Sequence, residues 1–321
     1  MGNMNSLNKL SPLLNLTLCF LFFLTGCEKS NHAEVKKEKI GGIDIAYYTR
    51  GSGQPLVMIM GFRGTMAIWD PELLNELEKK YTLILFDNRG VGLSSDTEKN
   101  LTTIPQMAED TFDLIKALGY DKVSVLGWSM GSRIAEYLTT THPEVVENLI
   151  LCSPNPGGNY QVARKTDAYQ KLTSQNISPD EALSLIYPNT SEGREASSSF
   201  VRRLTEAITK GSVPDDLKVS DRTIDRQVQA VSRWDKNNEN YNSLSNIKVP
   251  TLVAGGLADV LDQPENVKIV ASRIPFAWTA YFPGAGHAFL SQNAKNFADL
   301  VTNFIESNKT ASTKGPTNTG S

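Results

Sequence analysis

The sequence predicts an α/β fold, a mostly parallel sheet with helices on both faces and a helical cap insertion. Three observations predict this class. Several short apolar runs lack polar alternation, which is typical of strands buried on both faces. Segments with helical periodicity lie between these runs, and that order favours a parallel sheet. The alternation stops after Cys152 and resumes at Val249, and an interval of that size is more than a loop.

The strands of the predicted sheet come from short apolar runs. Five runs predict buried parallel strands, namely Leu56 to Met60, Thr82 to Phe86, Val123 to Leu126, Leu149 to Cys152, and Thr251 to Ala254. A further strand-like run is Thr279 to Phe282. Ahead of these, two runs that flank Gly41 and Gly42 predict an antiparallel hairpin.

Helices are predicted where apolar residues recur at three and four positions. One pattern runs from Ile104 to Leu118 and ends at Gly119, another begins at Ile134, and the last includes Phe297 to Ile305. Residues 154–245 hold further helical patterns and no convincing strand, so we expect a helical cap between core residues 40–153 and 246–306. Three aromatic residues of the cap could line a pocket but suit packing better: Tyr187, Trp234 and Tyr241.

The first residues have the pattern of a signal peptide. Residues 1–26 carry one charge, Lys9, and an apolar run of about 12 residues, too short to span a bilayer. The stretch from Leu24 to Cys27 resembles the bacterial lipoprotein box, so we expect Cys27 to be lipidated, with residues 27–39 as a polar tether. This predicts an anchored protein of the cell envelope. The alternative is an ordinary secreted protein, and the membrane leaflet stays open.

Composition excludes several classes of protein. The chain has 32 basic and 35 acidic residues, a net charge of −3, so nothing suggests a nucleic-acid partner. The three cysteines do not form a disulfide framework or a zinc site, and no metal or cofactor is expected. Residues 307–321 are polar and lack large apolar side chains, which predicts a disordered tail.

A candidate nucleophile lies in a G-x-S-x-G motif, Gly127 to Gly131, with Ser129 at its centre. The motif directly follows a predicted strand and precedes a predicted helix. In that setting the glycines allow a sharp turn that lifts the serine side chain from the sheet edge. The alternative is a tight turn in which Ser129 only caps the helix.

A serine hydroxyl needs a base to become a nucleophile at neutral pH, and histidine is the usual base. The chain has three histidines. His32 lies in the predicted tether, and His142 lies beside Pro143 at a helix end. His287 follows the predicted strand that ends at Phe282, in a glycine-rich loop that can project its imidazole toward the sheet end. We therefore expect His287 to be the base.

The base needs a carboxylate to orient it, and Asp259 is the best candidate. It lies in the loop that follows the strand predicted at Thr251 to Ala254. Asp262 in the same loop is the alternative, although it could instead cap the helix that begins near Pro264. The oxyanion requires backbone N–H donors, which we expect from Met130 and from Phe62 after the first buried strand.

These residues resemble the α/β-hydrolase superfamily from about Ile43 to Ile305. Beyond the serine motif, residues 87–94 resemble the D-x-R-G-x-G-x-S loop of its esterase-like and haloperoxidase-like members, and the chain order of Ser, Asp and His fits. The resemblance implies that Asp87 and Arg89 hold the fold together. One departure is Met60, where many relatives carry histidine before the oxyanion glycine.

The resemblance implies a serine hydrolase that cleaves a small-molecule carboxylic ester or related acyl bond. Ser129 differs from the aspartate that haloalkane dehalogenases and epoxide hydrolases carry at this turn, and residues 61–65 do not match the oxyanion loop of proline iminopeptidases. Two alternatives stay open. The same fold can serve as a binding protein with little or no turnover, and the same triad can act as a cofactor-free perhydrolase. Acyl chain length and oligomeric state cannot be deduced.

Overall fold

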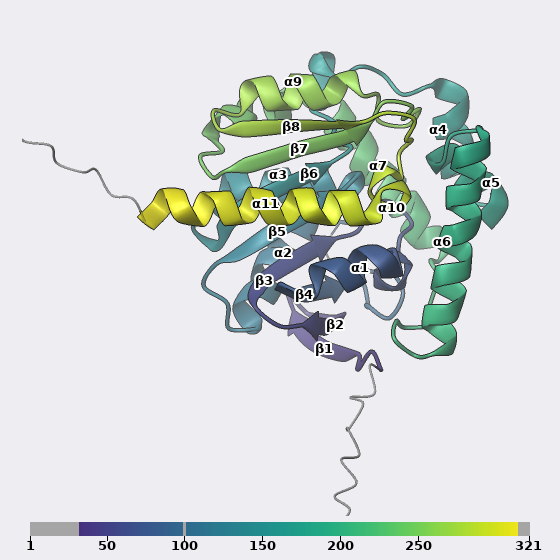
Figure 1. The fold of residues 1–321 in the computed structure, drawn as a ribbon, viewed down its shortest axis with the longest axis horizontal. Coiled ribbons are helices and arrows are strands. Elements are labelled where there is room, and N and C mark those ends of the chain that lie inside the picture. The colour runs from purple at the N-terminus through teal and green to yellow at the C-terminus, as the bar shows by residue number, and fades with distance from the viewer. Residues whose placement is uncertain (1–31, 99–100, 314–321) are drawn as a thin grey trace, which may run out of the picture. The chain divides into compact units, whose positions relative to one another are not determined.

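A computed structural model describes residues 32–98 and 101–313 of the chain. The predicted signal peptide and the predicted lipidation site Cys27 lie outside the described residues. Within them, eight strands form one sheet in the order β1-β2-β4-β3-β5-β6-β7-β8 (Figure 1). The strands are β1 (Lys36–Ile40), β2 (Ile43–Gly51), β3 (Gln54–Ile59), β4 (Tyr81–Phe86), β5 (Val123–Trp128), β6 (Val146–Cys152), β7 (Thr251–Gly256) and β8 (Ala277–Phe282).

The sheet is mostly parallel, as the apolar runs predict. From β4 through β8 every neighbouring pair of strands is parallel, while β1 pairs with β2 and β2 with β4 in antiparallel fashion. The five predicted buried strands correspond to β3, β4, β5, β6 and β7, and β8 contains the sixth run. The hairpin predicted around Gly41 and Gly42 is confirmed, with Ile40 opposite Ile43.

The predicted tether differs from the structure at its end, because Lys36–Lys39 belong to β1. Their side chains are mostly exposed, and only Ile40 of this strand is buried. The strand is held by backbone pairing with β2 along its whole length. A charged edge strand of this kind carries little apolar signal, which is why composition alone assigned it to the tether.

Helices cover both faces of the sheet. Figure 1 shows α11 and α1 in front of the strands, with α2 and α3 behind them. Successive strand residues alternate between the two cores, so that Leu56 and Met58 pack on the side of α1 and α11, and Val57 and Ile59 on the side of α2 and α3. These four helices are α1 (Pro71–Leu77), α2 (Ile104–Ala117), α3 (Met130–Thr141) and α11 (Ala294–Thr313).

The interval between β6 and β7 is helical in the described residues. It contains α4 (Thr166–Thr173), α5 (Pro179–Ile186), α6 (Ser191–Thr209), α7 (Asp221–Asp235) and α8 (Glu239–Ser243). Two further helices, α9 (Glu265–Arg273) and α10 (Phe289–Gln292), flank β8 in the chain. Figure 1 shows α4, α5 and α6 together at the end of the sheet where α10 follows β8, and α6 contacts both α10 and α1.

The C-terminal helix is longer than the sequence suggests. We predict a disordered tail from Ser307, whereas α11 continues to Thr313. The buried residues Phe297, Val301 and Phe304 anchor the first part of this helix in the core. Extending a helix adds one hydrogen bond for each residue fixed, so polar residues can continue it once packing has nucleated it. Within the described ranges, no helix is both long and apolar enough to cross a bilayer.

Candidate active site

The turn between β5 and α3 presents Ser129 at the carboxyl end of the sheet. Ser129 has φ +58° and ψ −118°, a backbone conformation that non-glycine residues rarely adopt. Its amide donates to the carbonyl of Cys152 on the neighbouring strand at 2.8 Å, and its own carbonyl accepts from the Ser132 amide at 2.9 Å. The strained turn is therefore held by hydrogen bonds from both sides.

The two glycines of the motif are required by close backbone contacts. A Cβ on Gly127 would lie 2.2 Å from the carbonyl oxygen of Gly131, and a Cβ on Gly131 would lie 2.0 Å from that of Ile59. The helix can therefore begin directly beneath the serine only because both positions lack a side chain. The side chain of Ser129 makes no capping hydrogen bond to α3, so the alternative in which it only caps the helix is wrong.

His287 and Asp259 form a buried pair at the same edge of the sheet. The imidazole Nδ1 lies 2.7 Å from Asp259 Oδ2, and the two residues are only 4% and 3% exposed. Burial lowers the pKa of His287, but the negative charge and hydrogen bond of Asp259 outweigh it, so the pKa lies above its ordinary value. This contact places the donor Nδ1–H on the carboxylate and leaves Nε2 as the basic nitrogen.

Backbone contacts bring the histidine loop against the loops that carry the other candidates. Trp128 Nε1 donates to the carbonyl of His287 at 3.0 Å, which connects this loop to the strand before Ser129. The amide of Ala258 donates to the carbonyl of Ala285 at 2.8 Å. A Cβ on Gly256 would lie 2.3 Å from that carbonyl oxygen. The loop after β7, which carries Asp259 (the acid loop), can therefore approach the loop after β8, which carries His287 (the histidine loop), only because residue 256 is glycine.

The other two histidines have different surroundings. His142 lies 3.0 Å from a carboxylate oxygen of Glu109 and stacks on Phe112 with ring centroids 3.8 Å apart. His32 lies beside Gly211 in the loop after α6. Neither residue lines the cavity that contains Ser129, in agreement with the choice of His287.

The loop after β3 lies against Ser129. A Cβ on Gly61 would lie 3.1 Å from the Cβ of Ser129, so this loop reaches the serine because Gly61 has no side chain. The amide of Arg63 donates to Gln227 Oε1 at 2.9 Å, whereas that of Phe62 has no acceptor among the described residues. Met130 is the first residue of α3, where helical amides lack an intrahelical partner. Both amides are therefore without an acceptor among the described residues.

A small cavity of about 30 Å³ brings the candidate residues together. Ser129, His287, Phe62 and Met130 all line it, and Asp259 lies behind His287. Among the described residues the structure records the bond between His287 and Asp259 but none between Ser129 Oγ and the imidazole. Catalytic hydrogen bonds of ligand-free sites often tighten only when substrate binds. The remaining lining residues are Arg133, Arg164, Tyr169, Leu172, Val231, Leu261 and Asp262.

Several cavity residues were not predicted from the sequence. Arg164, Tyr169, Leu172 and Val231 come from the cap, where no motif marks them. Arg133 could have been found, because a charged residue one helical turn after Ser129 must lie near it. The three aromatic cap residues singled out in the sequence do not line this cavity. Instead Trp234 donates to the Asn155 carbonyl, Tyr187 donates to Ser291, and Tyr241 stacks on Tyr160.

The loop of residues 87–94 holds the structure together, as the resemblance implies. Asp87 accepts from the amides of Met66 at 2.7 Å and Leu93 at 2.9 Å. Burial raises the pKa of Asp87 to about 6, although these two hydrogen bonds oppose the shift. Arg89 forms a bidentate pair with Asp110, with both distances 2.6 Å. These residues tie neighbouring loops to the sheet and do not line the cavity.

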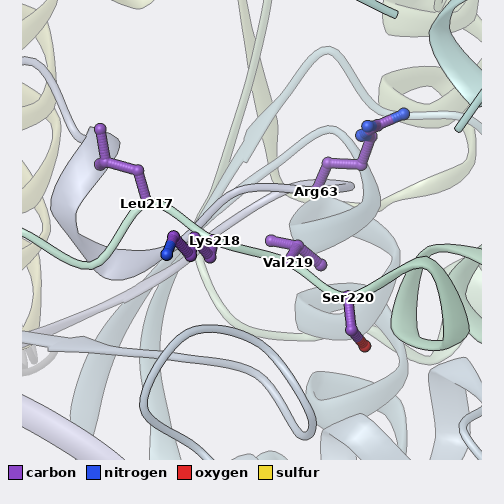
Figure 2. Close-up of a pocket in the computed structure, with 5 residues that line it drawn as sticks. All are labelled: Arg63, Leu217, Lys218, Val219 and Ser220. Carbon is purple, nitrogen blue, oxygen red and sulfur yellow. The ribbon is translucent and has the colours of Figure 1, made fainter. Parts of the chain in front are cut away.

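A larger hollow of about 550 Å³ lies between Arg63, in the loop after β3, and residues 217–220 of the cap. Figure 2 shows Leu217, Lys218, Val219 and Ser220 along one segment of the chain, with Arg63 beside it and its guanidinium group pointing away from that segment. This hollow contains no nucleophile paired with a base, so the candidate chemistry belongs to the smaller cavity. In the described part of the chain, no group of three histidine, cysteine or acidic residues is arranged to hold a metal ion.

Comparisons with known proteins agree on one family. A family model described as alpha/beta hydrolase fold matches residues 54–294. A Mycobacterium tuberculosis protein whose name describes a non-heme bromoperoxidase is 29% identical over 260 residues, covering 76% of this chain and 91% of that protein. A pimeloyl-acyl-carrier-protein methyl ester esterase of Nitrosomonas europaea is 26% identical over 253 residues, covering 76% of this chain and 92% of that protein.

A solved structure supports the same fold. An alpha/beta hydrolase fold protein from Chitinophaga pinensis superposes with a TM-score of 0.76 at 25% identity. The superposition covers 87% of this chain and 99% of that chain. The likeness therefore extends through both parts of the core and the interval between β6 and β7.

Proposed function

This chain belongs to the alpha/beta hydrolase fold family and has a hydrolytic role, and on that premise we propose that it is a serine hydrolase of carboxylic esters or related acyl bonds. One observation carries the proposal. Ser129 and His287 line the same cavity, and His287 is hydrogen bonded to a buried carboxylate, Asp259, on its other side. A nucleophile, a base and a group that orients the base are the parts that acyl transfer requires.

In the proposed reaction Ser129 Oγ attacks the acyl carbon while its proton passes to His287 Nε2. Asp259 accepts the Nδ1–H bond, holds this tautomer and stabilises the imidazolium that forms. The tetrahedral intermediate collapses, the alcohol leaves with the proton from the imidazolium, and an acyl-enzyme remains. Water then attacks the acyl carbon, His287 takes its proton, and the acid is released as Ser129 recovers its hydrogen.

The negative charge of the intermediate is stabilised by the amides of Phe62 and Met130. Both residues line the cavity beside Ser129, and the neighbouring amide of Arg63 is already engaged by Gln227. Each backbone donor of this kind contributes about 2.7 to 4 kcal/mol to lowering the barrier.

Replacing the nucleophile tests the proposal directly. We expect Ser129→Ala to reduce kcat for a 4-nitrophenyl ester by about 10⁴-fold or more and to abolish labelling by a fluorophosphonate. Ser198→Ala is the matched control, because Ser198 lies on α6 and its hydroxyl donates to the Arg194 carbonyl of its own helix. Wild-type turnover in Ser129→Ala would refute the proposal. Binding of a ligand by the wild type without turnover would favour a binding protein instead.

One relative favours a second candidate function. The name of the Mycobacterium tuberculosis protein describes a bromoperoxidase without heme. The same residues can serve a perhydrolase, in which hydrogen peroxide replaces water in the second step and the acyl group leaves as a peracid. A bromination assay with bromide, acetate and hydrogen peroxide separates the two functions, because only a perhydrolase gives rates that depend on peroxide and on Ser129.

We further propose that the protein is anchored in a bacterial membrane through Cys27. Support comes from the sequence, in which a charged residue, a short apolar run and the residues Leu24 to Cys27 follow in the order of a lipoprotein signal. Several acyl chains on one cysteine would hold the protein firmly, since each buried methylene contributes about 0.8 kcal/mol. Incorporation of labelled palmitate in wild type but not in Cys27→Ser tests this proposal, and equal labelling of both would refute it.

A further inference from the structure

A second carboxylate, Asp262, lies where three parts of the fold meet. It belongs to the same loop as Asp259, three residues further on. From α3, Arg133 Nη2 donates to both of its carboxylate oxygens, at 2.8 and 3.0 Å. Asn155 Nδ2, after β6, donates at 3.0 Å, and Arg164 Nη2, before α4, lies 3.4 Å away. Asp262 therefore joins the acid loop to the helix of the nucleophile and to the cap.

The same loop sets the orientation of Asp259. The amides of Leu261 and Asp262 donate to Asp259 Oδ1 at 2.8 and 3.0 Å. With one oxygen held by this turn, the other oxygen, Oδ2, faces His287 at 2.7 Å. Any shift of Asp262 would move the amides that orient Asp259. The position of Asp262 therefore affects the imidazole of His287 indirectly, through the hydrogen bonds from these amides to Asp259 and the hydrogen bond between Asp259 and His287.

The pair of Arg133 and Asp262 is almost completely buried, with both side chains 2% exposed. Burying two charges costs several kcal/mol, and a well-packed apolar pair is often as stable or more stable. The position of Asp262 near Pro264 suggested that it could cap α9. It does not, because the N-cap of that helix is Pro264 and the structure shows no side-chain capping bond there. A costly ion pair beside the reacting groups therefore calls for a reason other than packing.

We propose that Asp262 is a positioning residue of the active site: clamped by Arg133 and Arg164, it fixes the loop that presents Asp259 to His287, and its negative charge stabilises the imidazolium formed during the reaction. This inference rests on the proposed serine hydrolase mechanism. Arg133 has the opposite electrostatic effect, because its positive charge disfavours the imidazolium, while it holds Asp262 in place.

The electrostatics of the cluster agree with this role. Burial alone would raise the pKa of Asp262, but the positive charges of Arg133 and Arg164 bring it down to about 2, so Asp262 is ionised at neutral pH. The charged groups that act on His287 are Asp259 and Asp262, which raise its pKa, and Arg133, which lowers it. Two further acidic residues lie next to this cluster. Glu136 is close enough to Asp262 for their charges to interact, and Asp235 is paired with Arg164.

The test is the pH dependence of kcat/KM for 4-nitrophenyl acetate, followed at the isosbestic wavelength of nitrophenol and nitrophenolate. The acid limb reports the protonation of His287 in the free enzyme. We expect Asp262→Asn to move this limb down by about one pH unit, because it removes a negative charge near the imidazole. Arg133→Gln should move it up. A purely structural role would lower activity without shifts of opposite sign.

Asp235→Asn is the matched control. It removes the same charge from the other carboxylate bound to Arg164, and the charge of Asp235 is not among those that shift the pKa of His287. Its acid limb should coincide with that of the wild type. Thermal melting identifies any variant that does not fold. If only one of Asp262→Asn and Arg133→Gln folds, the acid limb of that variant is sufficient for the test. Unchanged limbs in the folded variants would overturn the proposal.

Failure of this inference differs from failure of the proposed function. If Ser129→Ala keeps turnover, the serine hydrolase mechanism is wrong and the role of Asp262 falls with it. If Ser129→Ala is inactive and Asp262→Asn has the wild-type acid limb, only the role assigned to Asp262 is wrong. Asp262→Glu, which keeps the charge, should restore the wild-type limb at least in part.

Discussion

At the scale of single residues, His287 is held between two opposing influences. Its burial disfavours the charged imidazolium, while the carboxylate of Asp259 at 2.7 Å favours it more strongly. The imidazole can therefore accept the serine proton without a large free-energy cost, provided that it is neutral when substrate arrives. The protonation state of the His287 imidazole therefore decides whether Ser129 can be activated.

The pH dependence of activity follows from this balance. His287 must be deprotonated to act as a base, and its pKa lies above the ordinary value of about 6.5, so kcat/KM should fall as the pH drops through a midpoint above 6.5. Initial rates between pH 5 and pH 9, measured at constant ionic strength, provide the check. A midpoint clearly below 6.5 would contradict the geometry described for His287 and Asp259.

Glu136 is a second residue whose protonation matters, and the reaction does not use it. Within the described residues its carboxylate oxygens are buried without a hydrogen-bond partner, and burial raises its pKa to about 8, partly offset by Arg133. Because the folded state binds this proton more tightly than the unfolded chain, the neutral carboxyl contributes stability below about pH 4.5. That contribution is lost as the pH rises through 8.

We expect Glu136→Gln to remove this pH-dependent cost, because glutamine has nearly the same shape and cannot ionise. The variant should raise Tm by about 2 °C or more at pH 9 and by less at pH 5. Thermal unfolding of wild type and variant at both pH values measures the difference. Equal changes at the two pH values would show that Glu136 does not bind its proton more tightly in the folded state.

At the scale of elements, the site depends on how closely α3 can approach β3. Gly131 lies in the first turn of α3, where a Cβ would lie 2.0 Å from the Ile59 carbonyl oxygen. The strained backbone of Ser129 is thus supported by a helix that packs directly on the neighbouring strand. The strained backbone of Ser129 therefore depends on the close packing of α3 on β3.

Gly131→Ala should therefore destabilise the fold by about 3 kcal/mol, because a methyl group would displace backbone rather than a flexible side chain. Gly119→Asn is the control, since Gly119 follows the end of α2 and has open space around its Cβ position, with φ +79°. Asparagine tolerates that conformation. Urea unfolding of both variants provides the comparison, and similar midpoints would argue against the close approach.

At the scale of the whole molecule, the cap and the core together close the cavity. Arg164, Tyr169, Leu172 and Val231 come from the cap, while Ser129 comes from the core, and the space between them is about 30 Å³. That volume is small beside the roughly 300–1,000 Å³ of typical ligand pockets. Short acyl groups should therefore fit with the smallest displacement of the cap.

Rates over a panel of aryl esters from acetate to palmitate should thus fall with chain length, by at least about tenfold between the ends. Leu172→Ala should shift the preference toward longer chains, because it removes apolar volume from the cap side of the cavity. Relative kcat/KM values for wild type and variant measure both effects. A wild-type preference for palmitate would mean that the cap moves much further than this structure indicates.

Much of the fold was predictable, because strands buried on both faces leave a local signal. The runs that became β3 through β7 are apolar over several consecutive residues, and helical patterns follow several of them. The two ends of the described chain were less predictable. Lys36–Lys39 join the sheet through backbone pairing, and α11 continues past Glu306 through helix propagation, and neither interaction requires apolar side chains.

The sequence by itself determined the mostly parallel sheet, the turn at Ser129 and the choice of His287, because these follow from local periodicity, glycine spacing and chain order. Only the tertiary structure decided that Asp262 binds Arg133 instead of capping α9, and that the amide of Phe62 is available while that of Arg63 is engaged. Arg133 and Asp262 are 129 residues apart in the chain. Contacts over such separations depend on packing geometry, which leaves no trace in the pattern of either segment alone.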